Sequence, residues 1–322
     1  MSVKLDLKNA LINGDFSYFQ RNTSFAAIAD STYTADRWMY RKTGTMVHTV
    51  SRSSDVPSSA FGIYSLLSDC TTAQVSIGAN DYTLISQRIE GNILRSFKNK
   101  KVVLSFWVKS TKTGTFCISI RNATDTRSLI KEYTISASNT WEKKIVRFQH
   151  DSFGTWDYAN GIGLKLGFVL ACGSNLRASA NSWQSGNFIA TSNQVNACDN
   201  IVNNFWLTDA CLQEDNEGQT REPEFRLAGR DIFEELQLCQ RYYEVGMVAS
   251  SGTAASTFSR WWSSYKTEKR IVPVVTYTII TGQNASAPSV VDVNTVFGAA
   301  GRSNGANIND WTAWTFRADA EL

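Results

Sequence analysis

The sequence predicts an all-β protein made of two β-rich modules joined by one helix. Hydrophobic residues alternate with period two through most of the first two-thirds of the 322-residue chain, which is the pattern of strands with one buried face. Clusters of Gly, Ser, Thr and Asn separate these runs, as at residues 111–114, 136–139 and 171–175. Many short strands with no helical pattern between them indicate a sandwich of antiparallel sheets.

Four runs in the first module show the strand pattern most clearly. In the first of them Leu104, Phe106 and Val108 share one face. The four predicted strands cover residues 102–109, 115–121, 162–170 and 205–212. We place the first module at residues 1–214 and a polar linker containing Gly and Pro at residues 215–230.

The second module, residues 231–322, opens with the amphipathic helix predicted over residues 231–244. Asp231 is the expected N-cap, Glu234 stands in the capping-box position, and Gly246 is the expected stop. The predicted apolar stripe of this helix comprises Ile232, Phe233, Leu236, Cys239 and Tyr243. Strand patterns return at residues 271–280, where Pro273 suggests an edge or first position, and at 311–318. So small a module is expected to need further surface to bury, and we expect it to oligomerise.

Composition argues against several classes of function. The net charge is only +3, and no run of Lys or Arg resembles a nucleic-acid footprint. No stretch reaches the ~18 apolar residues that span a membrane, and the first residues do not resemble a signal peptide. The six cysteines are widely spaced with no C-x-x-C pair, and there are two histidines. We therefore expect no nucleic-acid partner, no membrane insertion, no cofactor and no metal, and folding in a reducing cytoplasm.

The sequence predicts no catalytic centre, so we expect a binding protein and not an enzyme. Nucleophile-elbow, zinc-protease and phosphate-loop spacings are absent, and no pair of carboxylates suited to glycosidase chemistry is legible. Two loop-like segments instead combine aromatic and amide side chains, the groups that contact sugars. The candidate glycan ligands are Trp156, Tyr158, Asn160, Trp183 and Asn187. The alternative is that both tryptophans close loop bases onto the core, and Trp38, Trp107, Trp141 and Trp206 are predicted to be core residues.

Several motifs resemble those of tailed-bacteriophage virion proteins. They include Leu-Ile-Asn-Gly-Asp-Phe-Ser at 11–17, Tyr-Thr-Ala-Asp-Arg-Trp at 33–38 and Leu-Ser-Phe-Trp-Val-Lys at 104–109. The segment Leu-Gln-Leu-Cys-Gln-Arg-Tyr-Tyr-Glu at 236–244 and the ending Phe-Arg-Ala-Asp-Ala-Glu-Leu at 316–322 resemble the carboxy-terminal module of the same proteins. The resemblance is to the tail-fibre and capsid-accessory family, whose first domain is a jelly roll similar to carbohydrate-binding modules.

This resemblance implies an N-terminal jelly-roll β-sandwich, a connecting helix and a small C-terminal β-sandwich module. It also implies a non-enzymatic component of the virion, often trimeric, assembled in the host cytoplasm and contacting other virion proteins. A host-surface glycan is the implied ligand of a fibre or spike. Capsid decoration or a head fibre is the alternative, and a polysaccharide depolymerase is a third possibility.

A jelly roll places its first and last strands side by side, which would bring Asn13, Asp15 and Asp209 close together. In related carbohydrate-binding modules such oxygens often hold a structural calcium ion, which requires six or more oxygen ligands. We favour the alternative that Asp15 caps a turn and that Asp209 bonds to the backbone or to solvent.

Overall fold

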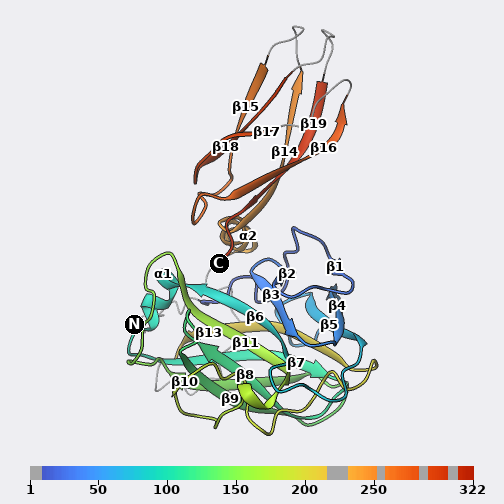
Figure 1. The fold of residues 1–322 in the computed structure, drawn as a ribbon, viewed down its shortest axis with the longest axis vertical. Helices are drawn as coiled ribbons and strands as arrows, with labels where there is room; N and C mark the ends of the chain where they lie inside the picture. Colours follow the sequence, from blue (N-terminus) through green and yellow to red (C-terminus); the bar gives the residue numbers. More distant parts are fainter. Residues whose placement is uncertain (1–8, 216–230, 252–257, 283–288, 304–310) are drawn as a thin grey trace. The chain divides into compact units, whose positions relative to one another are not determined.

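The computed structural model describes residues 9–215, 231–251, 258–282, 289–303 and 311–322 (Figure 1). The chain divides into two compact units, Met1–Asp231 and Ile232–Leu322, and each is described by itself. The predicted linker at 215–230 lies, apart from Asp215, outside the described residues. Among the described residues no helix is long and apolar enough to cross a membrane.

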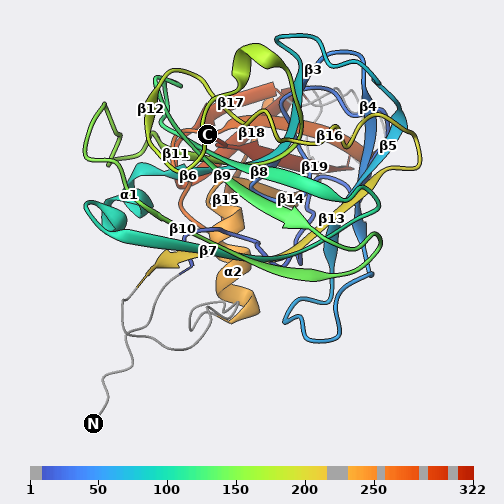
Figure 2. The same cartoon turned by 90° about the horizontal axis from the view of Figure 1, so that it is seen from below.

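The first unit is a sandwich of two antiparallel sheets (Figures 1 and 2). The six-stranded sheet has the order β1 (Ser24–Phe25), β4 (Val47–Ser53), β5 (Ser65–Thr72), β13 (Asn204–Glu214), β7 (Lys101–Ser110) and β10 (Glu142–Gln149). The seven-stranded sheet has the order β12 (Gln184–Ser185), β9 (Arg127–Ile135), β8 (Gly114–Arg121), β11 (Ile162–Cys172), β6 (Tyr82–Glu90), β3 (Trp38–Thr43) and β2 (Thr32–Tyr33). Short helical turns α1 (Gly91–Leu94), η1 (Arg95–Phe97) and η2 (Ser174–Leu176) complete the unit.

The core lies between these two sheets, as the alternating patterns predict. Leu104, Phe106 and Val108 of β7 all point into it. The ring of Phe106 meets that of Phe168 from the opposite sheet edge-to-face, with centroids 5.0 Å apart. Segment 9–14 runs beside β13, where Ala10 N donates to Leu212 O at 2.8 Å. The predicted all-β fold with a jelly-roll sandwich is confirmed, and the four predicted strands of this unit correspond to β7, β8, β11 and β13.

The outer faces of the two sheets differ. On the seven-stranded sheet, outward residues such as Leu84, Cys117 and Val169 form a second apolar cluster. Segment 176–190 covers them, because Leu176 and Phe188 pack against that cluster and Ile189 and Ala190 belong to it. On the six-stranded sheet the outward residues include partly exposed tryptophans, which are described below. The outward side chains of the seven-stranded sheet are therefore covered, whereas large side chains of the six-stranded sheet are partly exposed.

The second unit begins with α2 (Ile232–Gln240) and forms a small β-sandwich. One antiparallel sheet has the order β14 (Tyr243–Ser251), β19 (Trp311–Asp319) and β16 (Val274–Gly282). The other has the order β15 (Phe258–Ser264), β18 (Phe297–Ser303) and β17 (Ser289–Val293). Tyr265, Val275, Phe316 and Ala318 form the core. The predicted C-terminal sandwich is confirmed, and β16 starts directly after Pro273 at an edge of its sheet, as expected for a residue that cannot donate a ladder hydrogen bond.

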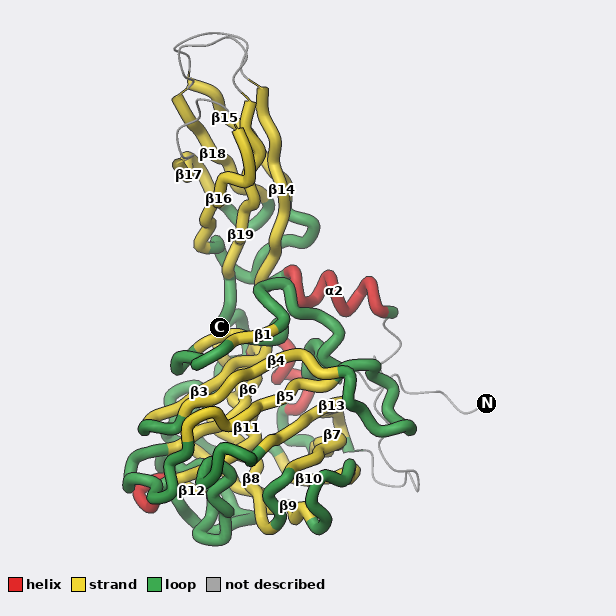
Figure 3. Tube along the Cα trace, turned by 90° about the vertical axis from the view of Figure 1, so that its right-hand side faces the viewer, coloured by secondary structure: helices red, strands yellow, loops and turns green. Residues whose placement is uncertain are grey.

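The helix predicted over residues 231–244 is shorter than expected, because α2 ends at Gln240 (Figure 3). Tyr243 and Glu244 instead begin β14, in register with Asp319 and Ala318 of β19. Only part of the predicted stripe is buried: Cys239 and Tyr243 are inside, whereas Phe233 is 72% exposed. The predicted stop, Gly246, lies within β14. Pairing with a strand far along the chain overrides the local helical period.

A buried ion pair fixes the junction between α2 and its sandwich. Lys269 Nζ donates to Glu244 Oε2 at 2.6 Å and to Gln240 O, the last residue of the helix, at 2.5 Å. The side chains of Lys269 and Glu244 are 0% and 1% exposed. Because neither charge can reach water, each depends on the other.

Candidate functional site

The structure brings three of the five predicted glycan ligands together in one aromatic cluster. His150, Trp156, Tyr158 and Trp183 form this cluster, which we call the loop aromatic cluster. The rings of Trp156 and Trp183 meet edge-to-face with centroids 5.5 Å apart, and His150 lies 4.6 Å from Trp156. Burial lowers the pKa of His150 because it penalises the charged imidazolium. The cluster therefore contains an imidazole that is neutral at neutral pH and lies against two of the three aromatic rings, those of Trp156 and Tyr158.

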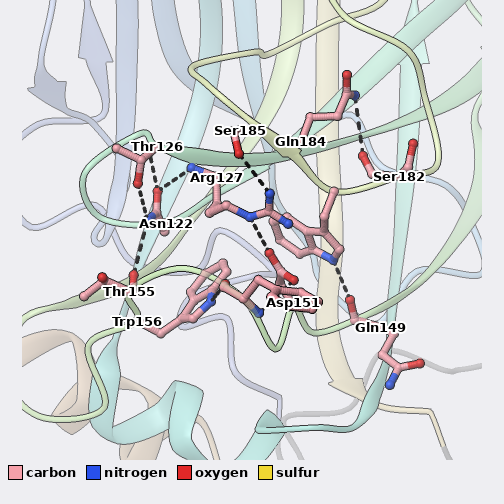
Figure 4. Close-up of polar contacts among 12 residues, drawn as sticks. Asn122, Thr126, Arg127, Gln149, Asp151, Thr155, Trp156, Ser182, Gln184 and Ser185 are labelled. Atoms are coloured by element: carbon pink, nitrogen blue, oxygen red, sulfur yellow. Dashed lines mark hydrogen bonds and ion pairs between the residues drawn. The ribbon is translucent and has the colours of Figure 1, made fainter.

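Polar contacts tie the loops of this cluster to one another (Figure 4). Trp156 Nε1 donates to Phe153 O at 2.8 Å, and Trp183 Nε1 donates to Gln149 O at 2.8 Å. Arg127 Nε donates to the buried carboxylate of Asp151 at 2.6 Å. Both indole N–H groups are thus used inside the protein.

The loop aromatic cluster also packs against the main core, which is the arrangement that the packing alternative describes. Trp156, Tyr158 and Trp183 are partly buried against that core. The two amides are engaged elsewhere: Asn160 Oδ1 accepts from Asn92 Nδ2 and Asn187 Oδ1 accepts from Arg121, each at 2.7 Å. A role for these five residues in glycan contact remains a prediction.

A second aromatic surface lies on the outer side of the six-stranded sheet, where the sequence predicted core residues. Trp38 is fully buried, as predicted. Trp107, Trp141 and Trp206 are partly exposed, so the prediction that they are core residues is wrong. We call these three residues the outward aromatic face. Alternation explains the position of Trp107, because its neighbours Phe106 and Val108 both point into the core.

Lys109 and Asp55 connect the outward aromatic face to the loop between β4 and β5. Lys109 Nζ lies 4.2 Å from the centroid of Trp206 and 5.4 Å from that of Trp141, and it forms an ion pair with Asp55. Trp141 Nε1 donates to Asp55 Oδ1 at 2.9 Å. Burial alone raises the pKa of Asp55, but the bonds from Lys109 and Trp141 outweigh it and hold that pKa below its usual value. The loop is therefore anchored over the sheet.

A pocket of about 380 Å³ opens beside Trp107, beneath the same loop. It is lined by Ser59, Ala60, Phe61, Ser105, Phe106, Trp107, Lys143 and Asp209. We call it the Ser105 pocket. Its volume lies in the lower part of the ~300–1,000 Å³ range of small-molecule sites, and it combines aromatic, hydroxyl and charged groups.

Asp209 holds the loop wall of this pocket. It lies at a register shift of β13 with a φ of 49°, a geometry that turns its side chain towards the loop. Its carboxylate accepts from Phe61 N at 2.7 Å and from Gly62 N at 2.9 Å. Burial raises the pKa of Asp209, and the nearby charge of Asp15 raises it further.

Asp15 and Asp209 do approach one another, as the jelly-roll argument expected. A Cβ on Gly62 would lie 3.0 Å from both Asp15 Cβ and Asp209 Oδ1. Asp15 accepts from Ser17 Oγ at 2.5 Å, and Asn13 bonds the backbone of Tyr18 and Asp36. Asp15 thus bonds within a turn and Asp209 bonds loop backbone, which is the arrangement that the alternative to a calcium site describes. Within the described residues no group of three or more His, Cys, Asp and Glu side chains is placed to hold a metal.

No protein-family model matches this chain. No curated protein matches it either. Among solved structures it is similar to a proposed sugar-binding protein of Bacteroides thetaiotaomicron, with 13% identity, a TM-score of 0.40, and coverage of 65% of this chain and 100% of the other. A family 11 carbohydrate-binding module of a Clostridium thermocellum cellulase gives 12% identity, a TM-score of 0.33, and coverage of 61% and 98%.

The enzymatically active domain of tailspike protein 4 of bacteriophage CBA120 gives 13% identity, a TM-score of 0.33, and coverage of 59% of this chain. The match spans only 21% of that tailspike chain. At such low scores and identities, these likenesses carry no argument about function.

Proposed function

We propose that this protein is a non-enzymatic bacteriophage virion protein that binds host-surface glycans through the outward aromatic face. The observation that carries the proposal is the position of Trp107, Trp141 and Trp206. Three large aromatic side chains are partly exposed on one outer face of the sandwich, and one of them lines the Ser105 pocket. Large aromatic side chains held at a surface beside polar groups are typical of binding sites.

The chemistry of this surface suits a sugar. The C–H face of a pyranose ring is apolar and lies flat against an aromatic ring, while its hydroxyls require donors and acceptors. Trp107 supplies the ring, and Ser105, Lys143 and Asp209 supply the polar groups. The loop aromatic cluster is the second candidate site, although both of its indole N–H groups already donate to backbone carbonyls.

The virion role is supported by the motifs at 11–17, 33–38 and 316–322, which resemble phage fibre and capsid-accessory proteins. A fibre or spike displays several copies of each site. Several weak contacts then act together, because the second binding event on one particle is effectively intramolecular. A homotrimer attached to other virion proteins is the arrangement that we favour.

Binding of purified protein to host cells and to a panel of polysaccharides tests this proposal. We expect Trp107→Ala to abolish binding and Trp183→Ala to retain it, with both proteins folded by circular dichroism. Loss in Trp183→Ala alone would move the site to the loop aromatic cluster. Wild-type protein that binds no cell surface and no glycan would refute the proposal.

Two further measurements test the other parts of the proposal. Immunogold labelling of phage particles is expected on the tail, and a signal confined to the head would make the protein a capsid decoration. Incubation with host polysaccharide is expected to release no reducing ends, and their release would make it a depolymerase.

A further inference from the structure

We infer that the Ser105 pocket takes a neutral pyranose unit, bound through two adjacent hydroxyl groups. This inference rests on the proposed function and names the class of sugar that the site selects. It is built on three features of the pocket: an unsatisfied hydroxyl, a pair of opposite charges, and a second carboxylate close by.

The unsatisfied hydroxyl belongs to Ser105, in the middle of β7. Its neighbours Leu104 and Phe106 point into the core, so Ser105 faces outward and lines the pocket. The residue is 1% exposed, and its Oγ has no hydrogen-bond partner among the described residues. A buried hydroxyl without a partner is costly. A ligand hydroxyl placed in the pocket would satisfy it.

Lys143 and Asp209 provide the opposite charges. An ammonium group only donates hydrogen bonds and a carboxylate only accepts them, whereas each sugar hydroxyl does both. Two adjacent hydroxyls therefore match the pair, one accepting from Lys143 and the other donating to Asp209. Asp209 already accepts one amide on each oxygen, and each oxygen has a second lone pair for a ligand.

The charge around the pocket disfavours an acidic sugar. Asp15 lies next to Asp209, and burial raises the pKa of both carboxyl groups. Two other cations on this face are engaged, Lys109 by Asp55 and Arg147 by Asp215. A ligand carboxylate would add a third negative charge beside Asp15 and Asp209, with Lys143 as the cation that lines the pocket. A neutral ring avoids that repulsion.

The Ser105 pocket is large enough for a pyranose ring. Phe61, which is 56% exposed, and Trp107 line it, and the volume is about 380 Å³.

Isothermal titration calorimetry with neutral polysaccharides (laminarin, galactan, mannan) and acidic ones (alginate, polygalacturonate, polysialic acid) tests the inference. We expect binding to at least one neutral polymer and to none of the acidic ones. Ser105→Ala is expected to weaken binding roughly three- to tenfold, the size of one lost hydrogen bond.

Ser119→Ala is the matched control and is expected to leave the affinity unchanged. Ser119 is also buried in a strand, its Oγ also lacks a partner among the described residues, and it lies on the seven-stranded sheet. Preference for acidic polymers, or equal affinity in Ser105→Ala and wild type, would overturn the inference. If Trp107→Ala still abolishes that binding, the proposed function stands and only the sugar class is wrong. If none of these polymers binds, the inference is overturned, and absence of binding to host cells as well would refute the proposed function.

Discussion

His48 makes the stability of the first unit depend on pH in a way that can be calculated from its surroundings. The side chain is buried in β4, with Nδ1 2.7 Å from the hydroxyl of Tyr40 and Nε2 3.7 Å from Cys198 Sγ. Burial lowers the pKa of His48 to about 4, and the charge of Lys42 lowers it further. The imidazole is therefore neutral in the folded protein wherever the pH is above that value.

The unfolded chain binds this proton more readily, because a free histidine has a pKa of about 6.5. The contribution of His48 is therefore fully present above pH ~6.5 and is lost progressively as the pH falls towards ~4. With these two pKa values, linkage predicts a loss of about 2.5 kcal/mol in the free energy of unfolding between about pH 7.5 and about pH 4.5.

Urea unfolding of wild type and His48→Gln at both pH values measures this contribution. His48→Gln is less stable at pH ~7.5 because it disturbs a packed site, but the difference from wild type is expected to shrink by about 2.5 kcal/mol at pH ~4.5. Asp15, Asp36 and Asp209, whose pKa values are raised, act in the opposite direction. They are present in both proteins, so their effects cancel. A difference that stays constant with pH would refute the reasoning.

Three further substitutions test other contacts. Lys269→Met leaves Glu244 buried without its cation and is expected to destabilise the second unit by about 3–5 kcal/mol in thermal unfolding; a change below 1 kcal/mol would contradict the buried pair. Gly246→Ala places a methyl group against the ring of Phe316. It is expected to lower the free energy of unfolding of the second unit by about 1–3 kcal/mol, measured in the same thermal unfolding experiment. Asp209→Ala removes two bonds to loop amides and is expected to cost about 2–4 kcal/mol; hydrogen exchange at those amides should speed up, and unchanged exchange would contradict the anchoring.

The strands were predictable because alternation is a local signal with a direct physical cause. Leu104, Phe106 and Val108 point into the core as their spacing requires. The same spacing places Trp107 on the other face, so its outward position could be predicted from the sequence. The preference for burying tryptophan led to the opposite prediction, and the position of the residue within its strand was the better guide.

Contacts between distant segments could not be read from local patterns. Trp156 and Trp183 belong to separate loops, and their edge-to-face contact depends on the order in which the strands lie in the sheets. Tyr243 fits the helical stripe as well as it fits a strand, and its pairing with Asp319 decides between them. The register shift that turns Asp209 towards the loop likewise depends on its partner β7.

The sheet of β14, β19 and β16 cannot form until β19 has been synthesised, because β19 is its central strand. β14 and β16 are made first, yet within the described residues each pairs only with β19, which lies between them and follows later in the chain. At roughly 5–20 residues per second, the ribosome leaves β14 without its neighbour for several seconds. A strand edge in that condition is open to any complementary strand nearby. Another copy of the same chain carries the same β19, so the unpaired edge of β14 is equally complementary to its own β19 and to that of a second copy.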